Sequence, residues 1–113
     1  MRNKTLSLLL TIFALSAVIS SCSKKTLADA NKAWDKKEFS NAVDIYRDVF
    51  RDVPKEDRGA VAFKIAEGYR MYNDYKNADR WYERVIKEKK ATELEKMNAT
   101  KMQADMKKRQ EMY

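Results

Sequence analysis

One pattern of small and aromatic residues occurs twice in this chain, 36 positions apart, and it restricts the folds that the chain can adopt. Aligning Ala42 with Ala78 brings the two halves into register. The other pairs that then coincide are Ala30 with Ala66, Phe39 with Tyr75, Tyr46 with Tyr82, Val49 with Val85, and Phe50 with Ile86. Recurrence at this interval indicates a unit of supersecondary structure that packs against copies of itself.

Each copy predicts two helices folded back on each other. The second helix of each copy places its small and apolar residues at i, i+4, i+7 and i+8, which is one face of an α-helix. The first helices carry a similar face, formed by Leu27, Ala30, Ala33 and Trp34 and then by Ala62, Phe63, Ile65, Ala66 and Tyr69. Two glycines, one proline and 36% charged residues also favour helices over a turn-rich sheet. We therefore expect an all-α fold in which alanines mark the helix crossings.

The pattern resembles the tetratricopeptide repeat, a helical hairpin that recurs with a period of about 34 residues. The first copy supplies Ala30, Phe39, Ala42, Tyr46 and Pro54, and the second supplies Ala66, Tyr69, Tyr75, Ala78 and Tyr82. The usual glycine between the helices is replaced by Lys37 and Asn73, and asparagine adopts a left-handed backbone more readily than lysine. The resemblance predicts two such repeats over residues 27–90. An irregular helical bundle with no repeat is the alternative.

Residues 91–113 are expected to form a charged C-terminal helix. Its apolar residues are only loosely periodic, at Leu94, Met97, Met102, Met106 and Met112. This helix is either a cap on the second hairpin or the first helix of a partial third repeat. Because such arrays usually need about three units, we expect the chain to be the opening part of a larger protein or a truncated gene product.

Residues 1–21 have the build of a secretory signal peptide. Arg2 and Lys4 form a positive start, and an uncharged apolar run follows from Leu6 to Ile19. This run is too short to cross a hydrocarbon core about 30 Å thick, so it predicts a segment that is cleaved rather than a permanent membrane span.

The end of this segment resembles the lipobox of bacterial lipoproteins. Ile19, Ser20 and Ser21 precede Cys22, the chain's only cysteine. The resemblance implies cleavage between Ser21 and Cys22 and attachment of diacylglycerol and an N-acyl chain to Cys22, with residues 22–26 as a lipidated tether. Two or three acyl chains anchor a protein stably, whereas one does not. An ordinary signal peptide followed by an incidental cysteine is the alternative.

The run AFKIAEGYRMYNDYKNADRWYERVIK, together with the lipobox, resembles the N-terminal module of tetratricopeptide-repeat outer-membrane lipoproteins of Bacteroidetes. Members of that group often continue into a propeller and an OmpA-like domain, and some belong to the type IX secretion and gliding apparatus. The resemblance covers roughly residues 1–90, so no peptidoglycan-binding function carries over. It implies a lipid-anchored protein-interaction scaffold of the cell envelope, at the outer membrane and facing the periplasm, with envelope proteins as partners.

Composition argues against several other functions. The chain has no histidine, which removes the usual general base and the commonest metal ligand. Without Arg2 and Lys4, 22 basic and 17 acidic residues remain, with the two signs interspersed, so neither nucleic acid nor a small-molecule substrate is an expected partner. Asp44, Asp48 and Asp52 lie at i, i+4 and i+8, but this spacing is also that of a solvated helix face. We predict no enzyme, metal or cofactor.

The first helices of stacked hairpins line a concave surface, so their exposed positions are the candidate partner-binding residues. These are Asn31 and Trp34 in the first unit and Phe63, Glu67 and Arg70 in the second, with Leu27 also facing the groove. An asparagine can bond a peptide backbone, an arginine can pair with a carboxylate, and an aromatic side chain can serve as an apolar anchor.

Two alternatives stay open for these residues. Trp34 and Phe63 can belong to the core, and the three polar residues can belong to a solvated face. The protein can also be an envelope tether or spacer with no ligand groove. Lys24, Lys25 and the cluster at 87–90 fit such a surface role, although basic runs often serve only solubility.

Overall fold

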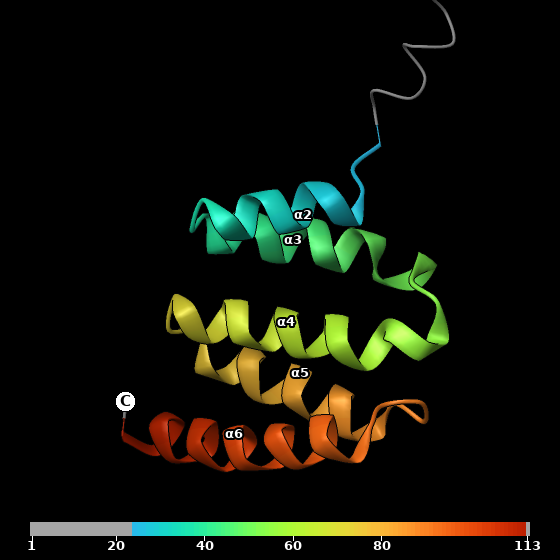
Figure 1. Ribbon diagram of the computed structural model, residues 1–113. Coiled ribbons are helices and arrows are strands. Elements are labelled where there is room, and N and C mark those ends of the chain that lie inside the picture. Colours follow the sequence, from blue (N-terminus) through green and yellow to red (C-terminus); the bar gives the residue numbers. More distant parts are fainter. Residues whose placement is uncertain (1–23, 113) are drawn as a thin grey trace, which may run out of the picture.

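The computed structural model describes residues 24–112, in which helices are joined by short turns and loops and there are no strands. The predicted signal peptide and the predicted lipidation of Cys22 lie outside the described residues. Figure 1 shows the helices stacked in chain order, with the C-terminal helix at the opposite end of the stack from the tether. The elements are α2 (Leu27–Asp35), α3 (Phe39–Val49), η1 (Phe50–Asp52), η2 (Lys55–Asp57), α4 (Arg58–Met71), α5 (Tyr75–Lys87) and α6 (Glu93–Met112).

The chain reverses direction at Lys37 and at Asn73, the two positions at which the resemblance leads to the expectation of a glycine. Both residues have a left-handed backbone, with φ of 63° and 64°. In the first turn, the N–H of Glu38 donates to the carbonyl of Ala33 at 3.0 Å. In the second, the N–H of Asp74 donates to the carbonyl of Tyr69 at 2.9 Å. Both turns are therefore Schellman motifs, which close α2 and α4 and start α3 and α5.

Side-chain caps fix where three of the helices begin. Thr26 and Asp29 form a capping box at the start of α2. Thr92 and Glu95 exchange the same pair of hydrogen bonds, at 3.0 Å and 2.9 Å, at the start of α6. Asp74 accepts from the N–H of Asn77 and caps α5. Because each cap satisfies N–H groups that a helix leaves unpaired, the helix starts are set by local sequence.

One hydrophobic core runs through both hairpins and α6. Ala42 and Ala78 are fully buried, as expected of alanines at which two helices pack closely. The tyrosines one turn later, Tyr46 and Tyr82, are 2% and 0% exposed and fill the space beside them. Small residues at a crossing let helix axes approach, and the neighbouring ring then packs the gap.

The two hairpins meet at Gly68 of α4. A Cβ at this position would overlap a methyl carbon of Val43 in α3 and would lie 3.3 Å from the Trp34 ring. The absence of a side chain therefore permits the close approach of the second hairpin to the first.

The C-terminal helix, expected over residues 91–113, is α6, and only part of its apolar set is buried. Ala99 and Met106 are fully buried, whereas Leu94, Met97 and Met112 are 62%, 55% and 67% exposed. The helix α6 therefore packs through the stripe that carries Ala99 and Met106. Leu27, predicted for the first hydrophobic face, is likewise exposed.

Polar contacts fix α6 against α5. Asp79 of α5 accepts hydrogen bonds from Gln103, Lys107 and Gln110 of α6, at 2.9, 3.2 and 2.9 Å. Burial alone would raise the pKa of Asp79, yet these three donors hold that pKa below its usual value. Within residues 24–112, no helix combines the length and apolarity that a membrane crossing requires.

Candidate interaction groove

A groove of about 480 Å³ lies along α2, α4 and α6, the first helix of each hairpin and the helix that follows them. These three helices come from distant parts of the chain and lie one above another in Figure 1. The groove lining consists of Trp34, Phe63, Lys64, Glu67, Arg70, Asn98, Lys101 and Met102. Four of the five predicted partner-binding residues are thus brought together, namely Trp34, Phe63, Glu67 and Arg70.

The aromatic side chains of the groove, Trp34 and Phe63, pack against other aromatic rings of the hairpins. Trp34 is half-buried and meets Phe39 edge to face, with ring centroids 4.9 Å apart. Phe63 is also half-buried and meets Tyr82 in the same manner at 5.4 Å. Trp34 and Phe63 therefore belong partly to the core and partly to the groove. Their interpretation as core residues and their interpretation as partner-binding residues are thus compatible.

Positive side chains outnumber negative ones in the groove lining. Lys64, Arg70 and Lys101 face a single carboxylate, that of Glu67. The ammonium of Lys64 lies 4.2 Å from the centroid of the Trp34 ring, a cation–π contact that places this charge over the aromatic face. The groove lining consequently carries a net positive charge beside its apolar side chains.

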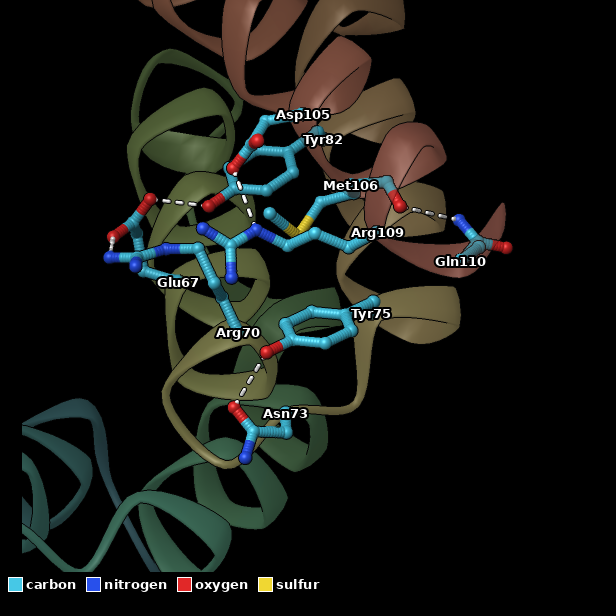
Figure 2. A network of polar contacts seen from close by, with 9 residues as sticks. All are labelled: Glu67, Arg70, Asn73, Tyr75, Tyr82, Asp105, Met106, Arg109 and Gln110. Carbon is cyan, nitrogen blue, oxygen red and sulfur yellow. Dashed lines mark hydrogen bonds and ion pairs between the residues drawn. The ribbon is translucent and has the colours of Figure 1, made fainter. Parts of the chain in front are cut away.

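The single carboxylate is already engaged by two neighbours, as Figure 2 shows. One oxygen of Glu67 accepts from Arg70 at 2.6 Å, and the other accepts from the hydroxyl of Tyr82 in α5. Burial, followed by the bond to Glu67, raises the pKa of Tyr82, so this hydroxyl remains a donor. Within the described residues, the buried Nε of Arg70 has no partner.

Asn31 occupies the corresponding place in the first hairpin. Its side-chain oxygen accepts from the hydroxyl of Tyr46, as Glu67 accepts from Tyr82, and each pair is 15 residues apart. Asn31 is exposed but does not line the groove, because its side chain is directed toward its own hairpin. The sequence placed Asn31 and Glu67 at equivalent positions but missed the hydrogen bond that both make within their hairpins.

Lys64, Asn98, Lys101 and Met102 line the groove and were not among the predicted residues. Three of them lie on α6, and the spacing of 33 residues between Ala66 and the buried Ala99 is a sequence signal that could have pointed to the packed side of this helix. The apolar residues of α6 are only loosely periodic, so the sequence did not indicate which side of this helix packs.

A second and larger hollow, of about 590 Å³, lies between the tether and the end of α3. Leu27 borders it rather than the groove. Its charged residues, Lys24 and Lys25 opposite Asp48 and Asp52, balance one another, so they select no charge on a ligand. Within residues 24–112, no group of three potential ligand side chains is arranged to hold a metal ion, the aspartates at 44, 48 and 52 included.

No family model, curated protein or solved structure matches this chain.

Proposed function

We propose that this protein is a docking scaffold, in which the groove of α2, α4 and α6 receives a segment of a partner protein. The observation that carries the proposal is the lining itself. Aromatic side chains supported by the core stand next to cations, and such rigid anchors with charged neighbours are characteristic of protein-binding sites. Binding, rather than catalysis, is the chemistry that this combination supports.

The hairpins α2–α3 and α4–α5 are proposed to be tetratricopeptide-like repeats, with α6 as the first helix of a partial third. The register that aligns the two hairpins supports this assignment. The left-handed residues Lys37 and Asn73 coincide in it, as do the buried alanines Ala42 and Ala78. In such arrays the first helices line the concave surface, and the groove of this protein is lined by residues of α2, α4 and α6.

The scaffold is further proposed to be anchored at the outer membrane through acylated Cys22, facing the periplasm. The lipobox-like sequence supports this step, and α2 begins only five residues later, at Leu27. A short tether would hold the groove near the lipid surface, where envelope proteins are available as partners. An accessory role in type IX secretion or gliding follows from the family resemblance.

Site-specific photo-crosslinking in the producing cells tests the docking function. A photoreactive side chain is placed at Met102 in the groove and, in a matched control, at Arg80 on the exposed side of α5. We expect a discrete protein adduct from position 102, identified by mass spectrometry, and none of the same composition from position 80. Equal adducts from both positions, or none from position 102, would refute a groove-centred scaffold.

A further inference from the structure

We infer that the groove selects an acidic protein segment, with a carboxylate bound at Arg70 and an apolar side chain seated between Phe63 and Met102. This inference rests on the proposed docking function and specifies the chemistry of the partner. Three features of the groove lead to it. They are the net charge of its lining, the unpaired Nε of Arg70, and the apolar surface of Phe63 and Met102.

The charge of the lining favours a negative ligand. Three cations line the groove, and the only carboxylate among its residues is bound on both oxygens by Arg70 and Tyr82. The ion pair of Arg70 with Glu67 has no net charge, so the positive excess of the lining comes from Lys64 and Lys101, neither of which takes part in an ion pair within residues 24–112. Charges of one sign that line a groove attract ligands of the opposite sign.

Arg70 offers a specific hydrogen-bond donor for a partner carboxylate, in addition to the general attraction of the positive side chains. One of its terminal N–H groups donates a hydrogen bond to Glu67, but its buried Nε donates to no group in the described part of the chain. Buried donors are rarely left unpaired, because they lose their bond to water without a replacement. The side chain of Arg70 is 32% exposed, so a partner carboxylate can approach the guanidinium from the groove, and a rotation of the side chain would bring this N–H to a carboxylate oxygen.

The place of the apolar anchor follows from what already covers the aromatics. The ammonium of Lys64 lies over the Trp34 ring, so this face is occupied. Phe63 is supported at its edge by Tyr82, and Met102 stands on α6 in the same groove. Methionine is flexible and polarisable and adapts its shape to an inserted side chain. We therefore place an aliphatic or aromatic partner residue between Phe63 and Met102.

The test is selection of random dodecapeptides, displayed on phage with no free C-terminus, against the full chain in nonionic detergent micelles. We expect the recovered peptides to carry at least twice the aspartate and glutamate content of the input library, together with an apolar residue. Selection against Arg70→Gln should return the acidic content toward that of the input. Lys101→Gln should reduce it in part, and the control Lys76→Gln on α5 should leave it unchanged.

Circular dichroism reports whether Arg70→Gln keeps its fold. If it does not, Lys101→Gln still decides the test, because Lys101 is exposed. Neutral or basic peptides, no recovered peptides, or the same acidic content from Arg70→Gln and Lys101→Gln as from the unmodified chain would overturn the inference. Displacement of the selected peptides by phosphatidylglycerol vesicles, but not by phosphatidylcholine vesicles, would also overturn it by assigning the cations to lipid headgroups.

The inference and the docking function fail in different ways. If the photo-crosslinked partner contacts position 102 through a segment without aspartate or glutamate, the groove still docks a protein but its acid selectivity is refuted. If position 102 yields no adduct, the docking function itself is refuted.

Discussion

The hydroxyl of Tyr82 in α5 donates a hydrogen bond to the carboxylate of Glu67 in α4, so the wall of the groove is bonded directly to the helix behind it. Tyr46 makes the equivalent bond to Asn31 in the first hairpin. The same tyrosine position thus joins the two helices of each hairpin, once to a charged acceptor and once to a neutral one. This difference leads to the first prediction.

Tyr82→Phe is expected to destabilise the protein more than Tyr46→Phe. A hydrogen bond to a charged group contributes about 1.5–3 kcal/mol, against about 0.5–1.5 kcal/mol for a neutral pair. Both tyrosines are buried, so the two substitutions remove the same hydroxyl from similar surroundings. Urea denaturation of both variants measures the difference in the free energy of unfolding. A larger loss in Tyr46→Phe would show that the charge on Glu67 is not what strengthens the bond.

Lys37→Gly is expected to raise the free energy of unfolding more than Asn73→Gly. A left-handed backbone costs a residue with a Cβ roughly 1–2 kcal/mol, and the entropy that glycine loses offsets about 0.5–1 kcal/mol of the gain. Asparagine tolerates this backbone better, so Asn73→Gly gains less, and it also removes the side chain that accepts from Tyr75. Thermal unfolding measures both variants. A destabilised Lys37→Gly would contradict the backbone argument.

Gly68→Ala is expected to destabilise the protein by about 1–3 kcal/mol, the usual cost of overpacking. On helix propensity alone the change would stabilise α4 by about 1 kcal/mol. The packing effect should prevail because the new Cβ would overlap the side chain of Val43. Calorimetry measures the outcome, with Ala60→Gly in the exposed first part of α4 as a control for propensity. A more stable Gly68→Ala variant would mean that the hairpins can separate without cost.

Acid is expected to loosen α6 from α5 through Asp79. The pKa of this carboxyl is lowered from 3.8 in the folded protein, so its stabilising effect is present above that value and is lost as the pH falls through the folded pKa. Amide hydrogen exchange should therefore show lower protection of α6 below about pH 4. In Asp79→Asn this part of the pH dependence should disappear. An unchanged pH profile in the variant would place the acid sensitivity elsewhere.

Much of the hairpin architecture could be predicted from the sequence because it depends on local chemistry. Ala42 and Ala78 mark the crossings, and Lys37 and Asn73 stand where the turns require a left-handed backbone. The packing of α6 could not be predicted in the same way. Its buried residues, Ala99 and Met106, are separated by two turns of mostly polar residues, and which stripe packs is decided by contacts with α5.

The groove was predicted in part for a related reason. Positions on the first helices identified Trp34, Phe63, Glu67 and Arg70, because the repeat pattern determines which face they occupy. The third wall, with Lys101 and Met102, depends on the docking of α6. The acceptor role of Asn31 also went unrecognised, because a hydrogen bond across 15 residues leaves no mark on periodicity.

The most direct test of the account compares Lys101→Glu with Lys76→Glu in binding to the protein that is crosslinked from position 102. Both lysines are exposed and both changes reverse one charge, but only Lys101 lines the groove. By isothermal titration with the full chain in micelles, we expect Lys101→Glu to weaken binding at least tenfold and Lys76→Glu to change the dissociation constant less than twofold. Equal effects of the two variants, or no effect of Lys101→Glu, would contradict a partner held in the groove of α2, α4 and α6.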